Sequence, residues 1–376
     1  MRPAGEAEKA RLGETFAELC GIESPFGRER ACAQRVGAEL GGMGLEVSED
    51  DAAAASGAEC GNLLARLPGR SDRFVLLCAH LDTVETTAPV EPVIVDGGWE
   101  NAHDGILGAD NKAAVAVILE VVRRASIEGS PVGLEILFTV SEENALAGAK
   151  AFDAGRLRSE FGYVFDHATP IGEVVLASPT YYRIAAEFLG RAAHAGIRPE
   201  AGRSAILAAA HAVAAMPLGR IDEQTTTNVG SIAGGVGSTN VVPARCRLLA
   251  EARSLDPDRV EAVVAGMVDA LTDGASAAEC DLDLTCEKLF EGYRTKPSSP
   301  AVAAAEAALR ATGYEPTRIV TGGGSDANAL VAGGLECVNL ANGTERNHEP
   351  TERVSISALE GMLDVTLALL EEAARA

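Results

Sequence analysis

The feature that most limits the fold of this chain is a set of largely apolar runs, each about the length of one strand. They read VLLCAHL (75–81), LEILFTV (134–140) and FGYVF (161–165). Strands that are apolar along their whole length are typical of a sheet covered on both faces. The segment 111–125 has a helical pattern that is apolar nearly all round, so it should be a buried helix. Alternating strands and helices predict the α/β class, with a mostly parallel central sheet flanked by helices.

The pattern changes near residue 180 and returns near residue 292. Between these points, alternating strands and two helices (204–216 and 257–271) follow the order β-α-β-β-α-β of a ferredoxin-like α+β domain. Beyond 292 a helix (300–313), further strands and a C-terminal helix from about 356 resume the first pattern. We therefore expect one domain formed by 1–179 and 292–376, with a second domain, 180–291, inserted into it.

Composition excludes several classes of function. The net charge of -23 argues against binding to nucleic acid or to anionic membranes, and it favours cations. No apolar run approaches the roughly 20 residues of a membrane helix, and the N-terminus lacks the apolar core of a signal peptide. The eight cysteines are scattered, with no zinc-finger spacing, as in a reduced cytosolic protein. We expect a cytoplasmic protein with no nucleic-acid or membrane partner.

The strand ends carry the chemically informative residues. Ligand sites in open α/β sheets form at the carboxyl ends of the strands. The side chains that this chain places there, or in adjoining loops, are His80, Asp82, Asp110, Glu142, Glu143, Asp166 and His348. Any single one of them could be ordinary: a solvated strand end, or a helix cap in the case of Asp110. So many acids in one cleft would repel one another unless a cation were bound.

The types of these side chains indicate the metal. Histidine and carboxylate ligands without cysteine suit zinc, with cobalt or manganese as possible substitutes. Five ligands exceed the usual three of a single catalytic zinc, but they suit two ions that share a bridging carboxylate. Adjacent side chains on an extended strand point in opposite directions. One glutamate of the 142–143 pair could then bind metal while the other serves as a general base.

Several motifs resemble a known family. The segments AHLDT, ILGADNKAAV, TVSEE, VFDH, GRAAHAG, STNVVP, EARS and GGGSDANAL occur in this order between about residues 60 and 360. They resemble the di-zinc metallopeptidase family that includes peptidase T, aminoacylase, acetylornithine deacetylase and glutamate carboxypeptidase. The resemblance is greatest to peptidase T-like members. It implies a catalytic di-zinc domain and an inserted lid domain that also serves in dimerisation.

The resemblance also implies roles for the strand-end residues. His80 and Asp166 would hold one zinc, Glu143 and His348 the other, and Asp110 would bridge them. Asp82 would accept the imidazole N–H of His80 and so fix its tautomer. Glu142 would be the general base. His167 competes with Asp166 for the ligand role, and the motif favours Asp166.

In the inserted domain and in the glycine-rich loop, the resemblance implies substrate contacts. His194 would help to stabilise the tetrahedral intermediate, and Asn240 and Arg253 would bind the substrate carboxylate, which suits the planar guanidinium. Gly323 and Gly324 could form a plain turn or a nest of backbone N–H groups that binds an anion.

The expected function is hydrolysis of the amide bond of short peptides, foremost by a tripeptide aminopeptidase with two Zn²⁺ per chain that forms a homodimer through the lid. An alternative on the same scaffold is an N-acyl amino acid deacylase or a small carboxypeptidase. A more remote one, from another class, is a non-catalytic metal-dependent binding protein, which the presence of Glu142 argues against.

Overall fold

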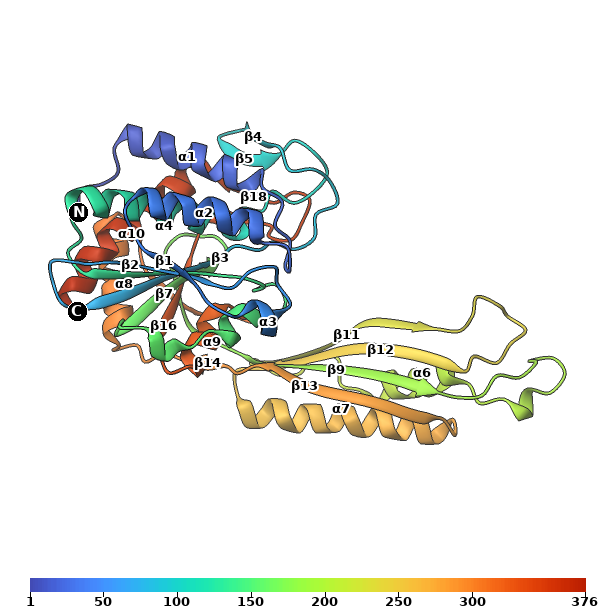
Figure 1. The fold of residues 1–376 in the computed structure, drawn as a ribbon. Coiled ribbons are helices and arrows are strands. Elements are labelled where there is room, and N and C mark those ends of the chain that lie inside the picture. Colours follow the sequence, from blue (N-terminus) through green and yellow to red (C-terminus); the bar gives the residue numbers. More distant parts are fainter. The chain divides into compact units, whose positions relative to one another are not determined.

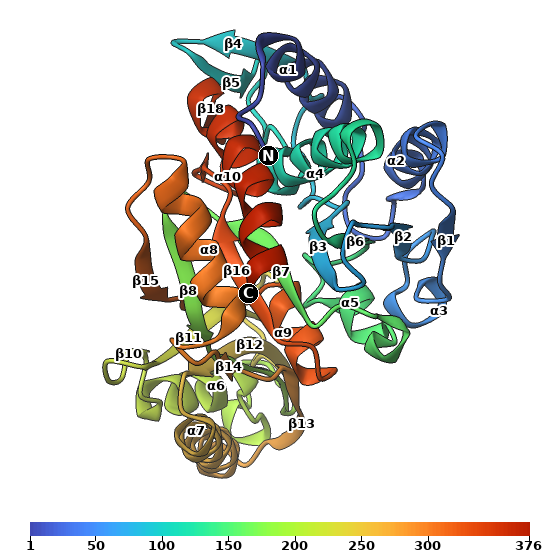
Figure 2. The ribbon, with the colours of Figure 1, turned by 90° about the vertical axis from the view of Figure 1, so that its left-hand side faces the viewer.

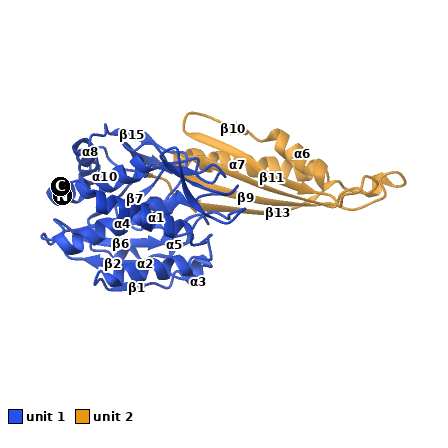
Figure 3. Cartoon of the chain, turned by 90° about the horizontal axis from the view of Figure 1, so that it is seen from above, with its two compact units in different colours: residues 1–177, 294–376 blue, residues 178–293 orange.

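The structure is a computed structural model that describes residues 1–376. The chain forms two compact units, coloured separately in Figure 3. The first unit contains Met1–Ala177 and Arg294–Ala376, and the second contains Ser178–Tyr293. The range 180–291 expected for the inserted domain lies within the second unit.

The helices of the first unit are α1 (Glu6–Cys20), α2 (Arg30–Gly42), α3 (Ala53–Ser56), α4 (Ala109–Glu128), α5 (Ala147–Ala151), α8 (Pro300–Ala311), α9 (Asp326–Ala332) and α10 (Ile356–Arg375), with a 3₁₀ turn at Ala154–Arg156. The strands of its main sheet are β1 (Val47–Glu49), β2 (Leu63–Leu67), β3 (Phe74–His80), β6 (Gly133–Thr139), β7 (Phe161–His167), β8 (Glu173–Ser178), β14 (Tyr293–Arg294), β15 (Thr317–Val320) and β16 (Cys337–Ala341).

The predicted α/β class is confirmed. The main sheet has the order β1-β2-β6-β3-β7-β16-β8-β14, with β15 paired to β8. Its central strands β6, β3, β7 and β16 are parallel to one another, whereas β1 and β2 pair antiparallel at one side. In this unit α4 packs on one face of the sheet and α9 on the opposite face (Figure 1). On the α4 side, α8 and α10 lie side by side (Figure 2).

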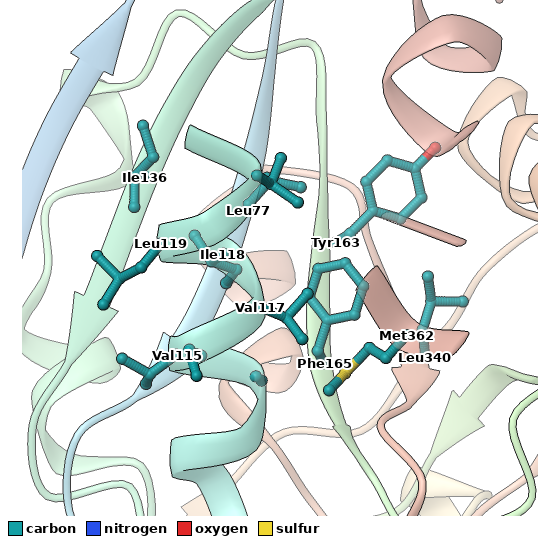
Figure 4. Packing of buried hydrophobic residues seen from close by; sticks show 14 of the residues in the cluster. Leu77, Val115, Val117, Ile118, Leu119, Ile136, Tyr163, Phe165, Leu340 and Met362 are labelled. Atoms are coloured by element: carbon teal, nitrogen blue, oxygen red, sulfur yellow. The ribbon is translucent and has the colours of Figure 1, made fainter. Parts of the chain in front are cut away.

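The core of the first unit explains why these segments fold as they do. Leu77 of β3 lies opposite Ile136 of β6 and Tyr163 of β7, so the three side chains form one row across the sheet. This row is fully buried together with Val117 and Ile118 of α4 (Figure 4). Each such side chain contributes about 1.5–3 kcal/mol when it leaves water. The parallel strands and their crossover helix are therefore held in fixed register, and so are the strand ends.

A second, smaller sheet in the first unit was not predicted. It has the order β17-β18-β5-β4, with β4 (Pro92–Val95), β5 (Gly98–Asn101), β17 (Thr344–Glu345) and β18 (Arg353–Ser355). The β4–β5 hairpin turns at Asp96 and Gly97, whose φ angles of 48° and 73° suit an Asp-Gly type turn. Strands β17 and β18 flank the segment that carries His348, so this sheet fixes both ends of that segment.

The second unit contains β9 (Thr180–Leu189), α6 (Ala205–Ala215), β10 (Gly219–Arg220), β11 (Thr225–Gly234), β12 (Arg245–Ser254), α7 (Pro257–Ala277) and β13 (Asp281–Phe290), with a 3₁₀ turn at Pro199–Ala201. Its antiparallel sheet has the order β10-β11-β12-β9-β13. Apart from the two-residue β10, this is the predicted β-α-β-β-α-β arrangement.

Helices α6 and α7 cover one face of the second unit's sheet and give it a separate core. Ser204 and Asp256 cap their N-termini by accepting backbone N–H groups. Helix α7 runs six residues further than the predicted end at 271. Gly274 lies in this extension, and its missing side chain lets α7 approach the Ala208 carbonyl of α6 closely. None of the chain's helices combines the length and the apolar character that spanning a membrane would require.

Candidate metal centre at the carboxyl edge of the sheet

Three parallel strands deliver the centre of the candidate site. His80 is the last residue of β3, Asp166 lies near the end of β7, and the Glu142–Glu143 pair follows β6. Because β6, β3 and β7 are parallel neighbours, their carboxyl ends meet at one edge of the sheet. Asp110 at the start of α4 and His348 after β17 reach the same place from elsewhere in the sequence.

Asp110 lies between the two histidines. Its Oδ1 is 3.3 Å from His80 Nε2, and its Oδ2 is 3.3 Å from His348 Nε2. His80 Nε2 is also 3.6 Å from Asp166 Oδ1, and His348 Nε2 is 2.8 Å from Glu143 Oε1. Each oxygen of one carboxylate thus faces a different histidine, and each histidine has an acid of its own. This is the arrangement required of a carboxylate that bridges two ions.

Two overlapping sets of ligand atoms lie close enough to hold ions. In each set, all atoms lie within 4.8 Å of one another: His80 with Glu142 and Asp166, and His80 with Asp110 and Glu143. His80 Nε2 and Asp110 Oδ1 are buried and have no hydrogen-bond partner. An unpaired buried polar atom costs about 1–3 kcal/mol, so two such atoms facing each other fit a cation between them. The donor set of imidazole and carboxylate suits zinc, manganese or cobalt.

Burial and mutual repulsion raise the pKa of three acids of the centre, Asp166, Glu142 and Glu143. Burial, reinforced by the negative charge of Asp110, raises the pKa of Asp166 to about 8. Burial also raises the pKa of Glu142 well above its usual range, and that of Glu143 by less because His348 donates to it. Hydrogen bonds to Asp110 and Glu143 raise the pKa of His348 to about 10. Protons therefore balance the charge when no ion is bound, and metal binding must release them.

The loop that carries the glutamate pair is held by four consecutive hydrogen bonds. The backbone N–H groups of residues 140–143 donate in turn to Asn62 Oδ1 (3.1 Å), Glu29 Oε1 (3.0 Å) and the two carboxylate oxygens of Asp82 (3.0 Å each). Ser141 has a φ of 51°, so the chain has already left the extended conformation there. Both glutamates consequently turn into the cluster, and the opposite orientation expected of an extended strand does not apply.

Asp82 links the β3 end to this loop. The His80 Nδ1 atom lies 2.9 Å from the Asp82 backbone carbonyl oxygen and 3.5 Å from its carboxylate Oδ1. The closer partner of the imidazole N–H is therefore the carbonyl, whereas the carboxylate mainly receives the N–H groups of Glu142 and Glu143. The Asp82 carbonyl thus lies closer to the His80 imidazole than the carboxylate does, and the role of the carboxylate in fixing the tautomer stays a prediction.

The Asp110 side chain is directed to the histidines and not to the backbone of α4. Its φ and ψ of -81° and 102° interrupt the helix at this point, and its two carboxylate oxygens face His80 and His348. His167, the competing ligand, pairs with Glu173 at 2.9 Å and belongs to neither ligand set. Asp166 is fixed by Asn339, whose side-chain amide accepts from the Asp166 N–H and donates to its carbonyl.

Sequence reasoning missed four side chains around the centre, namely Glu29, Asn347, Glu352 and Asp326. Asn347 donates to Asp110 Oδ2 at 3.0 Å, and Glu352 accepts three backbone N–H groups of the segment 107–110. Asp326, buried at the start of α9, accepts a hydrogen bond from Thr139. Asp326 stood within the motif GGGSDANAL, and Asn347 and Glu352 are close to His348 in the sequence. Glu29, Asn347 and Glu352 are polar residues in polar surroundings, and nothing local distinguishes them from exposed loop residues.

The second-unit residues fall into two places. His194 and Asn240 belong to adjoining segments, because the Ala195 N–H donates to the Asn240 carbonyl, and both are exposed. Arg253 lies near the far end of β12, where it pairs with Glu251 and stacks on Tyr181 at 4.0 Å from the ring centroid. About eight residues of strand separate Arg253 from the end of β12 near Asn240, roughly 26 Å. Within this unit, Arg253 is thus not brought together with the other two.

The glycine-rich loop lies in the first unit just before α9. The Gly323 N–H donates to Thr321 Oγ1 at 3.1 Å, and Gly324 is followed by Ser325, the N-cap residue of α9, whose N–H donates to Asn328 Oδ1 at 3.2 Å. These contacts describe a turn that leads into a capped helix.

Comparisons with known proteins agree with this architecture. Residues 76–372 match peptidase family M20/M25/M40. The chain is 36% identical to YqjE of Bacillus subtilis over 367 residues, covering 97% of this chain and 99% of that protein. Among solved structures it is similar to the aminopeptidase PepT from Bacillus cereus, with 36% identity, coverage of 97% and 99%, and a TM-score of 0.87. It is also similar to a tripeptidase from Staphylococcus aureus, with 34% identity, coverage of 98% and 99%, and a TM-score of 0.92. The predicted resemblance is confirmed: the chain belongs to peptidase family M20/M25/M40, among its peptidase T-like members.

Proposed function

We propose that this peptidase is a dinuclear metal-dependent aminopeptidase that cleaves the first residue from short peptides, tripeptides foremost. The observation that carries the proposal is the position of Asp110, one carboxylate oxygen toward each histidine. The similar proteins named as an aminopeptidase and a tripeptidase support the choice of substrate.

In this proposal His80 and Asp166 hold one ion, Glu143 and His348 hold the other, and Asp110 bridges them. Zinc is the ion proposed first, with cobalt or manganese as substitutes. When bound, the ions would supply Lewis acidity that polarises the amide carbonyl and favours ionisation of the attacking water.

Glu142 is the residue proposed to transfer the proton of the attacking water. Glu143 is tied to His348 at 2.8 Å, which leaves Glu142 as the other carboxylate of the pair and the one proposed for proton transfer. Glu142 takes a proton from the attacking water and gives it to the leaving amine, so one group serves as base and then as acid. Its backbone N–H is fixed by Asp82, so the carboxylate starts from a defined position.

Homodimerisation through the second unit is part of the proposal. Strand β13 is an edge strand, and β11 pairs with β10 only at Thr226 and Thr227, so much of two edges lies open. Open edges are pairing surfaces unless they are covered. The roles proposed for His194, Asn240 and Arg253 in substrate binding stay predictions. Light scattering on the purified protein at micromolar concentration checks the dimer, and a monomer mass would contradict it.

The test of function uses the zinc-loaded protein with Leu-Gly-Gly and with its N-acetylated form, and identifies the released residue by mass spectrometry. Free leucine from the unblocked peptide alone is the expected result. Free glycine from the acetylated peptide would instead indicate a carboxypeptidase. Hydrolysis of acetyl-leucine, assayed in parallel, without cleavage of either peptide would indicate a deacylase.

A further inference from the structure

We infer that Glu352 is a positioning residue of the metal centre, which fixes Asp110 relative to His348 by binding the backbone of the segment 107–110. The inference rests on the proposed function, because it takes Asp110 and His348 as metal ligands. It concerns a residue that does not itself face the ions.

Glu352 has an unusual set of contacts for a carboxylate that is only 2% exposed. Its Oε2 accepts the N–H groups of Leu107 (2.9 Å) and Gly108 (2.7 Å), and its Oε1 accepts the N–H of Asp110 (2.9 Å). No cationic side chain lies within ion-pair distance of it. The whole carboxylate is therefore used to bind main-chain N–H groups.

Those N–H groups lie in the segment that leads into α4, before the regular part of the helix, because Asp110 and Asn111 do not have helical φ and ψ. Gly108 has a φ of 75°, a conformation that glycine adopts without strain and that turns the chain into the helix. Glu352 thus provides the hydrogen-bond acceptors for three N–H groups of this non-helical segment. It selects one conformation for the segment that ends in Asp110.

The same short segment also holds the Asp110 side chain. Glu352 follows His348 by four residues, and the Glu352 N–H donates to the Glu349 carbonyl at 2.9 Å, which closes a turn between them. Just before this turn, Asn347 donates to Asp110 Oδ2 at 3.0 Å and His348 contacts the same oxygen at 3.3 Å. Asp110 is thus bound by its main chain and by its carboxylate to one segment, more than 230 residues away in the sequence.

Removing the Glu352 carboxylate should therefore affect the ions and not only the fold. In Glu352→Gln an amide NH₂ replaces one of the two acceptor oxygens, so at least one buried N–H would face a donor, and the segment 107–110 would relax toward another conformation. Asp110 would then no longer present one oxygen to each histidine. Groups that orient metal ligands typically account for about ten- to a hundred-fold in metal affinity.

Glu135 provides a matched control within the same unit. It is fully buried in β6, and its Oε2 accepts the N–H groups of Arg158 and Ser159. Like Glu352, it therefore binds the backbone of a loop with its carboxylate. It lies toward the start of β6, whereas the metal centre lies beyond the end of that strand. A carboxylate that merely stabilises the fold should behave like Glu135.

The experiment compares the full-length wild type with Glu352→Gln, Glu352→Asp and Glu135→Gln. Zn²⁺ affinity and stoichiometry are measured by competition with a chromophoric chelator, and the Co²⁺-loaded proteins are compared by visible absorption. For Glu352→Gln we expect about ten- to a hundred-fold weaker metal binding, an altered Co²⁺ spectrum and a lower kcat at similar KM. Glu352→Asp, which keeps the charge, should recover part of the affinity. Glu135→Gln should lower Tm and leave metal binding unchanged.

Each other outcome has a distinct meaning. If Glu352→Gln binds Zn²⁺ like the wild type and gives the wild-type Co²⁺ spectrum, the positioning role is wrong, whatever happens to Tm. If Glu352→Gln does not fold, Glu352→Asp decides in its place, and wild-type affinity there overturns the inference. If the wild type itself binds no metal, the proposed function fails first, and this result is separate from any difference between variants.

Discussion

The two histidines of the metal centre differ in their access to solvent. The His80 side chain is 1% exposed and that of His348 is 50% exposed. His80 also belongs to both ligand sets, whereas His348 contacts only Asp110 and Glu143. The ion next to His348 should therefore exchange more easily, and the ion next to His80 should be the retained one.

This difference predicts the order of metal loss. Replacement of His348 by Ala should leave about one ion per chain, because His80, Asp166 and Asp110 remain. Replacement of His80 by Ala should spare only the set of Asp110, Glu143 and His348, whose more exposed ion should be lost at a lower chelator concentration. Metal analysis after dialysis against a weak chelator measures both. Two retained ions in either variant, or firmer retention in His80→Ala than in His348→Ala, would contradict the assignment.

Glu142→Gln tests the proton transfer. The amide cannot accept the proton of the attacking water, so kcat should fall by about 10²–10⁴-fold while bound zinc is retained. Glu14→Gln, an exposed change on α1, is the control and should leave kcat unaltered. Kinetics on a tripeptide together with metal analysis separate the two effects. A variant with near-normal kcat would refute the role given to Glu142.

At the scale of single residues, the sequence predicted which side chains lie at the strand ends. It did not predict the distant residues that form hydrogen bonds to them. His80, Asp166 and the glutamate pair could be predicted to converge, because parallel strands bring their carboxyl ends to one edge. Their metal-binding and catalytic roles stay predictions. Glu29 reaches Ser141 across 112 residues and Glu352 reaches Asp110 across 242. Such partners come together only in the folded structure, and no local spacing in the sequence predicts them.

Among the elements, long periodic helices were predictable and short strands were not. The predicted helices 204–216 and 300–313 correspond to α6 (Ala205–Ala215) and α8 (Pro300–Ala311). The small sheet was missed because its strands have only two to four residues and β18 pairs with β5 some 250 residues earlier in the chain. Strands this short carry too little alternation to stand out from loops.

Helix α5 packs against the loop that carries Glu142 and Glu143. A Cβ on Gly148 would lie 2.0 Å from the Val140 carbonyl oxygen, at the start of the loop that carries Glu142 and Glu143. Gly148→Ala should therefore displace this loop and lower both Tm and kcat. Gly266→Ala in α7, where nothing lies within 4 Å, should instead stabilise the protein by about 0.5–1 kcal/mol. Thermal unfolding and activity of the two variants test the contrast, and normal activity in Gly148→Ala would refute it.

Helices α1 and α4 are joined by a buried ion pair that should show in acid. Glu8 accepts two hydrogen bonds from Arg124 at 2.6 Å, and others from the Gly5 N–H and Arg2. Burial raises the pKa of Glu8, but these donors outweigh it and lower the pKa to about 2. Since the folded pKa lies below the unfolded value, the stabilisation is complete above about pH 5 and is lost as the pH falls toward 2.

Glu8→Gln should accordingly lower the free energy of unfolding by about 2–3 kcal/mol at pH 7. The difference from the wild type should shrink by roughly 1 kcal/mol at pH 4, because the wild type begins to lose its advantage there. Urea unfolding at the two pH values measures it, with the exposed Glu6→Gln as control. A difference that stays constant with pH would mean that Glu8 is not ionised by its partners.

The molecule as a whole has two separate cores, one per unit. Metal removal should act on only one of them, because all the proposed ligands belong to the first unit. Calorimetry of the zinc-loaded and chelated protein should show the transition of the first unit shifted down, since an ion that binds the native state stabilises it. The transition of the second unit should stay in place. A uniform shift of both would contradict the independence of the two cores.

The chain leaves the first unit and returns to it through neighbouring strands, β8 and β14. The Thr295 N–H donates to the Leu176 carbonyl at 2.8 Å, so the two crossing points are joined by a backbone hydrogen bond. Excising residues 178–293 would therefore leave two ends that a linker of a few residues can close. In evolutionary terms the second unit is an insertion at a single junction of the first unit. Recombination at that junction can exchange, enlarge or remove it, while the sheet that carries the proposed metal ligands keeps its register.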